Sequence, residues 1–285
     1  MNPYYPTFES SYKRLGYNTF NSRQLDWVNS DRFRASIKIL LLPAGYRLTV
    51  DFTPFETTVP TLFFVAHNQF LTMLSGTADT AAMVHYNRDF YCVQIHDAEV
   101  ACDGLLFNNI LQIPKIDLTP TAHATMSSLF ARIADELQQQ ESSVEEMIRT
   151  YLKQIIILAT REWKKQHLDT LVPLVEPAEK EFFRNFGQLV EIHYKEKHTV
   201  ADYATLMGIA PKTLANKFNR LHLENPNEII KNRIVLEAKR LLVYTDQSVK
   251  EIAFQLGYDD PAYFNRLFTQ KAGASPAGFR KGMKG

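Results

Sequence analysis

The side chains that could bind a metal ion or carry catalysis are few in this sequence and stand apart. A metal-dependent enzyme on a small β-barrel needs histidines clustered with a carboxylate, usually as His-x-His on one strand. Here His67, His85 and His96 lie on different segments, and His-x-His does not occur. The two cysteines, Cys92 and Cys102, cannot form a four-thiolate zinc site, and we interpret them as core residues. We expect no metal site and no cofactor.

Loops that bind nucleotides or activate a serine are also missing. The sequence contains no Gly-x-Gly and no Gly-x-Ser-x-Gly. A dinucleotide-binding loop and a hydrolase nucleophile elbow both depend on such glycines. We therefore expect that the protein is not an enzyme.

Polar and basic residues are instead organised in an internal repeat near the C-terminus. Val200-Ala201-Asp202-Tyr203-Ala204-x3-Gly208 aligns with Val249-Lys250-Glu251-Ile252-Ala253-x3-Gly257 at an offset of 49. At an offset of 50, Pro211-x2-Leu214-x3-Phe218 aligns with Pro261-x2-Phe264-x3-Phe268, and Asn225-Pro226 aligns with Ser275-Pro276.

Each copy of the repeat predicts a helix, a short turn and a second helix. The small Ala204 or Ala253 allows two helices to cross closely, and the glycine four residues later can end the first helix in the left-handed conformation. A proline is tolerated in the first turn of the second helix. Two apolar residues spaced i,i+4 then hold that helix in the core. The pattern is typical of a helix-turn-helix, whose second helix enters the major groove of DNA.

The buried pairs determine which side of each second helix is exposed. Asparagine on such a face suits adenine, arginine suits guanine, and alanine can contact a thymine methyl group. For Arg266 the alternative is a salt bridge to Asp259 or Asp260. The predicted exposed faces are Lys212, Ala215, Asn216 and Asn219 in the first copy, and Ala262, Tyr263, Asn265 and Arg266 in the second.

Further motifs surround the second copy: Ala238-Lys239-Arg240-Leu241-Leu242, Leu256-Gly257-Tyr258, Tyr263-Phe264-Asn265-Arg266-Leu267-Phe268 and Gly273-Ala274-Ser275-Pro276-x2-Phe279-Arg280. Together with Val249–Ala253 they resemble the signature of the AraC/XylS family of bacterial transcription regulators. The resemblance covers roughly the last hundred residues. It implies seven helices, with two helix-turn-helix units joined by a long central helix, Asn227–Tyr244. The first unit matches more loosely, with Leu223 where the family usually has glycine.

The resemblance also implies roles for single residues. By their match to the family motif, the base-facing set is Lys212, Ala215, Asn216, Ala262, Asn265 and Arg266. Phosphate contacts position a protein on DNA without reading its sequence. The candidates for these contacts are Lys217, Arg220, Lys239, Arg240, Lys271 and Arg280.

Residues 33–110 predict short β-strands separated by turns. Many short strands at close spacing favour a small barrel or sandwich. With the helices that follow, this layout resembles the cupin-like jelly-roll domain that commonly serves this family for effector binding and dimerisation. The predicted strands are Ser36–Leu42, Arg47–Phe52, Thr61–Ala66, Ala81–Tyr86 and Tyr91–Ile95; the predicted turns are Pro43-Ala44-Gly45, Thr53-Pro54, Asn87-Arg88-Asp89 and Asp103-Gly104.

Two helices are predicted after the strands, over about residues 121–139 and 143–167, with Ser142 or Ser143 capping the second. The second helix carries two apolar stripes. It is therefore either a long core helix or a helix buried on both sides, with a second subunit as one neighbour. The stripe proposed for the dimer interface is Val144, Ile148, Tyr151, Ile155 and Leu158, and the other is Leu152, Ile156, Ala159 and Trp163.

The chain of 285 residues is long enough for two domains. We predict an α+β chain with a cupin-like domain over residues 1–168, a proline-marked linker over 169–178 and an all-α DNA-binding domain over 179–285. Charge is divided in the same way, because residues 178–285 carry a net charge of +5 and residues 1–177 carry −4. A basic C-terminal part suits a polyanionic partner.

The sequence thus predicts a sequence-specific, double-stranded-DNA-binding transcription regulator. It is expected to be a homodimer that can respond to a small effector, with RNA polymerase as a further candidate partner. Without a membrane span or an export signal, we expect it in the cytoplasm. The effector and the choice between activation and repression stay open. The alternatives are a cupin-type enzyme and an alkyl-transfer repair protein with a DNA-binding module.

Overall fold

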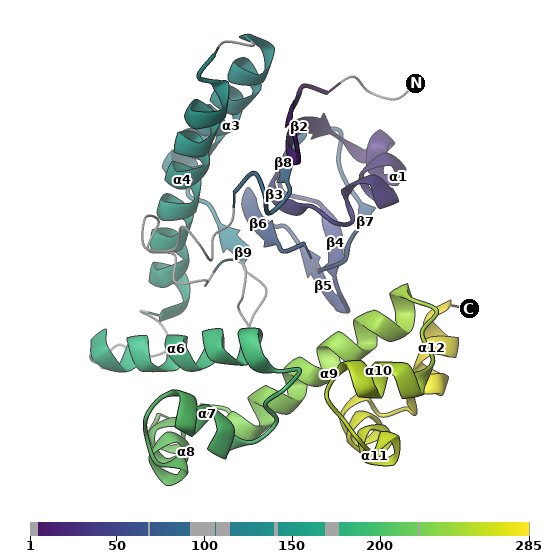
Figure 1. Cartoon of the computed structure of the whole chain (residues 1–285). Helices are drawn as coiled ribbons and strands as arrows, with labels where there is room; N and C mark the ends of the chain where they lie inside the picture. Colours follow the sequence, from purple (N-terminus) through teal and green to yellow (C-terminus); the bar gives the residue numbers. More distant parts are fainter. Residues whose placement is uncertain are drawn as a thin grey trace. The chain divides into compact units, whose positions relative to one another are not determined.

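The computed structural model describes residues 5–67, 69–91, 106, 115–139, 142–168, 177–221 and 223–284. The chain divides into two compact units, Met1–Pro173 and Leu174–Gly285, called here the N-terminal and C-terminal units (Figure 1). Strands occur in the first and helices alone in the described part of the second, which confirms the α+β class. Cys92, Cys102, His96, the predicted strand beyond Tyr91 and linker residues 169–176 lie outside the described residues.

The described residues of the N-terminal unit form two antiparallel sheets. One has six strands in the order β1-β2-β8-β3-β6-β9, and the other has three in the order β5-β4-β7. A short α1 (Leu25–Val28) precedes β3. The strands are β1 Thr7–Ser10, β2 Lys13–Phe20, β3 Ile37–Leu42, β4 Arg47–Val50, β5 Thr53–Glu56, β6 Thr61–Val65, β7 Leu71–Ser75, β8 Ala81–Tyr86 and β9 Lys115–Asp117.

Four of these strands, β3, β4, β6 and β8, lie where the sequence predicted them. The Thr53-Pro54 turn was wrong, because these two residues begin β5. β5 pairs only with β4 among the described strands, so it is an edge of its sheet. Proline is tolerated at an edge, where a missing N–H breaks no ladder hydrogen bond.

The six-stranded sheet is covered on both faces, and β3 shows why. All six of its residues are buried, as expected for a strand inside two cores. Because side chains alternate along a strand, Leu40 and Leu42 pack into the core between the two sheets. Ile39 and Leu41 point the other way, into a core completed by two long helices.

These two helices are α3 (Pro120–Gln139) and α4 (Val144–Trp163), which run beside each other (Figure 1). α4 begins after Ser143, whose side chain makes no capping hydrogen bond, unlike the prediction.

The proposed dimer stripe on α4 requires a correction. Val144, Ile148, Tyr151 and Ile155 are buried in the core of the single chain, where Ile148 and Ile155 are 0% exposed. Leu158 is half-buried against the same core. The second stripe is buried there too, so α4 is a core helix. The four buried side chains therefore have almost no surface left to offer a second subunit.

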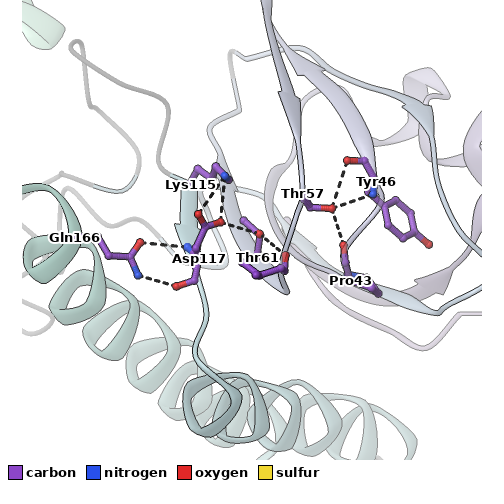
Figure 2. A network of polar contacts seen from close by, with 8 residues as sticks. Pro43, Tyr46, Thr57, Thr61, Lys115, Asp117 and Gln166 are labelled. Atoms are coloured by element: carbon purple, nitrogen blue, oxygen red, sulfur yellow. Dashed lines mark hydrogen bonds and ion pairs between the residues drawn. The ribbon is translucent and has the colours of Figure 1, made fainter.

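A π-helical turn, η3 (Lys164–Leu168), ends α4 and directs Gln166 at the edge strand β9. The Gln166 amide donates to the Asp117 carbonyl at 2.6 Å, and its oxygen accepts from the Asp117 N–H at 3.2 Å (Figure 2). Asp117 in turn accepts from Thr61 Oγ1 at 3.0 Å and pairs with Lys115 at 3.1 Å. The side-chain amide therefore protects an edge strand as a neighbouring strand would. In the other sheet's loops, Thr57 Oγ1 donates to the Pro43 carbonyl.

The described part of the C-terminal unit has seven helices, as the family resemblance implied. The central helix was predicted to within one residue of its start. The helices are α6 Pro177–His193, α7 Val200–Leu206, α8 Pro211–Arg220, α9 Pro226–Tyr244, α10 Val249–Gln255, α11 Pro261–Ala272 and α12 Pro276–Lys284. No helix of the described residues is long and apolar enough to cross a membrane.

Candidate nucleic-acid interface

The first helix of each repeat begins with the same reciprocal cap. Thr199 Oγ1 accepts from the Asp202 N–H, and the Asp202 carboxylate accepts from the Thr199 N–H at 2.9 Å. Ser248 and Glu251 make the same pair of bonds at the start of α10. Each box satisfies helix N–H groups that have no partner within the helix. The two first helices are thus started by equivalent local chemistry.

The turns that follow also match. Gly208 has φ +67° and Gly257 has φ +78°, the left-handed conformation that glycine adopts without a Cβ clash. Pro211 and Pro261 then occupy the first turns of α8 and α11. The Asp260 side chain caps α11 by accepting from the Ala262 N–H at 2.8 Å. Both glycine conformations and both prolines follow the prediction.

The apolar pairs hold the second helices as predicted. Leu214 is 0% exposed and Phe218 2% exposed in α8. Phe264 and Phe268 are both 0% exposed in α11. Helical geometry therefore turns the intervening residues of α8 and α11 outward.

Most of the candidate base-facing residues lie on those outward faces. Lys212, Asn216, Ala262 and Arg266 are exposed. Ala215 and Asn265 are half-exposed.

Arg266 makes no ion pair among the residues that the structure describes. The rival salt bridge is disfavoured for Asp260, whose carboxylate caps the helix. The Arg266 guanidinium instead lies over the Tyr263 ring, with its Cζ 5.9 Å from the ring centroid.

The candidate phosphate contacts divide into exposed and buried residues. Arg220 is exposed. Lys217 and Lys239 are half-buried, with their ammonium groups over the rings of Phe182 at 4.6 Å and Phe279 at 5.5 Å. Arg240, in contrast, is 5% exposed and pairs with Glu237 at 3.1 Å. A guanidinium that is buried and paired with a buried carboxylate does not reach DNA, so the prediction of Arg240 as a phosphate contact was wrong.

Two further candidates are engaged inside the unit. Lys271 pairs with Glu228 and donates to Asn232 Oδ1 at 2.9 Å, which joins α11 to the start of α9. Arg280 donates to the carbonyls of Leu242 at 2.8 Å and Gln247 at 2.5 Å, at the end of α9. Satisfying carbonyls beyond a helix end is a structural task. Both residues hold other helices against α9.

A buried charge cluster on α9 was missed by the sequence analysis. Arg233 is 3% exposed, pairs with Glu191 of α6 at 2.8 Å and with Glu237 at 3.1 Å, and lies 3.9 Å from the centroid of the Tyr194 ring. Burial alone would raise the pKa of Glu237, but the charges of Arg233 and Arg240 hold it below its ordinary value. The cluster ties α6 to the central helix.

Two of the three histidines considered as metal ligands, His67 and His85, lie among the described residues, on separate segments. His85 lies half-buried on β8, and His67 follows β6. Among the described residues, no group of three histidine, cysteine, aspartate or glutamate side chains could hold a metal ion.

Comparison with known proteins places the repeat within a recognised domain. A helix-turn-helix domain model matches residues 203–282. The transcriptional regulator YisR of Bacillus subtilis is 32% identical over 95 residues, which are 33% of this chain and 33% of that protein. The transcriptional activator RhaS of an Enterobacter species is 29% identical over 131 residues, 44% of this chain and 47% of that protein. A structure of ToxT from Vibrio cholerae with bound unsaturated fatty acid aligns with 96% of each chain at 12% identity and a TM-score of 0.42.

The matches thus span between a third and a half of these curated relatives. Residues 203–282 of this chain thus match a helix-turn-helix domain, as the repeat in its sequence predicted, and the relatives that share this region are named as transcriptional regulators.

Proposed function

We propose that the protein is a sequence-specific DNA-binding transcription regulator. The observation that carries this proposal is the pair of equivalent helix-turn-helix units in the C-terminal unit, each with its second helix anchored by two buried residues and a polar outer face. Two such helices in one chain suit successive major grooves on one side of a duplex. Arg266, Asn265 and Asn216 carry the donors and acceptors that base edges require.

The proposal is tested by selecting bound duplexes from a randomised pool with the full-length protein. The selected site is then changed one base pair at a time and titrated at two salt concentrations. Arg266→Ala should cost about 1–3 kcal/mol at the selected site and relax the preference at one base pair. Its salt dependence should change little, because no phosphate contact is lost.

Arg220→Ala is the matched control, since Arg220 is an exposed arginine at the end of the other recognition helix. It should weaken binding to all sequences alike and give a shallower salt slope. Recovery of no preferred sequence by the wild-type protein would refute the proposed function. A loss that is equal on every sequence for Arg266→Ala would make Arg266 a phosphate contact.

The finer parts of the function are proposals with separate support. RhaS is named an activator, and we propose activation, through contact with RNA polymerase, for this protein as well. Such a regulator acts on the bacterial chromosome and hence in the cytoplasm. A small effector is supported by polar side chains inside the N-terminal unit, where Asn18 is 2% and Lys38 3% exposed. A homodimer would need a surface other than the buried α4 stripe. Sedimentation of the full-length protein measures its oligomeric state.

A further inference from the structure

The second helix-turn-helix unit is held by a direct backbone contact with the segment ahead of the first unit, as well as by α9. The turn of the second unit, at Gly257, lies against the segment that joins α6 to α7, ahead of the first unit. A Cβ atom at Gly257 would stand 2.0 Å from the Lys195 carbonyl oxygen and 3.2 Å from His198 Cε1. Only a glycine permits this approach of two backbones.

A row of flat side chains starts at this contact and ends at the second recognition helix. The His198 ring stacks on Tyr258 with centroids 4.5 Å apart and an interplanar angle of 24°. Tyr258, which is 7% exposed, stacks in turn on Tyr263 at 5.8 Å and 29°. Tyr263 is the third residue of α11 and is 50% exposed. The row therefore connects the contact at Gly257 to the exposed face of α11.

The last member of the row is Arg266, the predicted guanine reader. Its Cζ lies 5.9 Å from the centroid of the Tyr263 ring, within the range of a cation–π contact. An exposed arginine otherwise samples many rotamers, and bidentate recognition needs one orientation of the planar guanidinium. A ring fixed beside it narrows those rotamers before DNA arrives. Pre-ordering of this kind increases affinity and the penalty for a mismatched base pair.

His198 is suited to stacking rather than to hydrogen bonding. Its Nε2 atom is buried and has no hydrogen-bond partner within the described part of the chain. A buried polar atom without a partner is unfavourable, so this nitrogen does not stabilise the fold. A phenyl ring at the same place would keep the stack and remove the unpaired atom. This difference separates a stacking role from every role that needs the imidazole nitrogen.

We propose that His198, Tyr258 and Tyr263 are positioning residues that orient Arg266, so that the segment ahead of the first helix-turn-helix unit sets the base preference of the second. The proposal rests on the proposed function, since it requires that Arg266 reads a base. It assigns a role in sequence recognition to His198, which lies outside both recognition helices.

The test uses the full-length protein and the set of single-base-pair variants of its selected site. Arg266→Ala first identifies the base pair that Arg266 reads. At that base pair alone, His198→Ala and Tyr263→Leu should lower discrimination about 2- to 5-fold, the value of an exposed cation–π contact. His198→Phe and Tyr263→Phe keep the flat rings and should discriminate as the wild type does. Tyr263 is exposed, so Tyr263→Leu is expected to fold normally even if His198→Ala does not.

Three outcomes would overturn the proposal while the proposed function stands. The first is that His198→Ala and Tyr263→Leu lose affinity equally on every sequence. The second is that they lower discrimination at base pairs other than the one that Arg266 reads. The third is that neither His198→Phe nor Tyr263→Phe restores wild-type discrimination. A wild-type protein that selects no sequence would instead remove the proposed function, and this proposal with it. An Arg266→Ala variant that relaxes no base pair would overturn the positioning role alone, because sequence selection would then persist without Arg266.

Discussion

A buried lysine in the N-terminal unit gives a prediction whose size follows from the structure. Lys38 on β3 is 3% exposed, and its Nζ donates to the Ser36 carbonyl at 2.8 Å. Burial lowers the pKa of Lys38 from 10.5 to about 8, although the charge of Asp51 opposes this change. The difference between these two pKa values corresponds to about 3 kcal/mol of destabilisation while the lysine is charged. Lys38→Met removes this cost and gives up one hydrogen bond worth about 1 kcal/mol. The variant should be more stable at pH 7 by about 2 kcal/mol.

The stability advantage of Lys38→Met should depend on pH. The folded protein loses the Lys38 proton near pH 8, whereas the unfolded chain keeps it up to about 10.5. Between these values the unfolded state binds more protons, so the wild-type protein gains stability as pH rises. Lys38→Met lacks this gain, and its advantage at pH 7 should fall to near zero by about pH 10.

Urea unfolding followed by tryptophan fluorescence measures this difference in the intact chain. The chain has two tryptophans, Trp27 and Trp163, and both lie in the N-terminal unit, so unfolding of the C-terminal unit does not change the signal directly. Lys165→Met is the control, because the Lys165 side chain is 66% exposed, and it should change stability by less than about 0.5 kcal/mol at any pH. The reasoning fails if Lys38→Met is no more stable at pH 7, or if its advantage is equally large at pH 10.

Three further predictions concern packing and protonation. Gly257→Ala should lower the thermal midpoint of the C-terminal unit, followed by circular dichroism, more than Gly208→Ala. Both alanines cost about 1–2 kcal/mol in the left-handed conformation, but only the Cβ at 257 meets another atom within 4 Å. Equal losses would contradict the close contact between Gly257 and the Lys195 carbonyl. Burial lowers the pKa of His85 to about 3, so only the unfolded state takes up this proton between pH 6.5 and 3. As the pH falls through this range, the free energy of unfolding of the N-terminal unit should decrease by up to about 5 kcal/mol. A His85→Gln variant whose stability depends on pH as the wild type's does would refute this account. Gln166→Leu should destabilise the N-terminal unit by about 1–3 kcal/mol in the fluorescence assay, because the Asp117 N–H and carbonyl both lose their hydrogen bonds to the Gln166 side chain. An unchanged stability would show that water replaces the Gln166 amide as their partner.

Sequence reasoning succeeded where the signal is local. A glycine, a proline and an i,i+4 apolar pair lie within a few residues of each other, so the helices and turns of both copies of the repeat were predicted. Strands β1, β2, β5, β7 and β9 were missed. Several are only three to five residues long, and β5 begins with Thr53-Pro54, which favours a turn.

Errors arose where the neighbour decides the role of a residue. Periodicity showed that α4 has two apolar stripes, but it does not tell whether a sheet, another helix or a second subunit covers each one. Arg240 resembled a surface cation because arginine is seldom fully buried unless it is paired. Its partner, Glu237, is three residues away on the same helix, and the cluster closes only when α6 brings Glu191 to Arg233.

The two copies of the repeat also combine features set by local sequence with features set by a distant neighbour. Their first helices have equivalent capping boxes, and their turn glycines have nearly equal φ values. Yet the position of a Cβ at Gly208 is open space, whereas that at Gly257 is filled by the Lys195 carbonyl. Local chemistry therefore explains why both positions hold glycine, but only the second glycine also lies against the backbone of the segment between α6 and α7. A substitution at Gly208 should act on one turn, while a substitution at Gly257 should act on how the two recognition helices are held relative to each other.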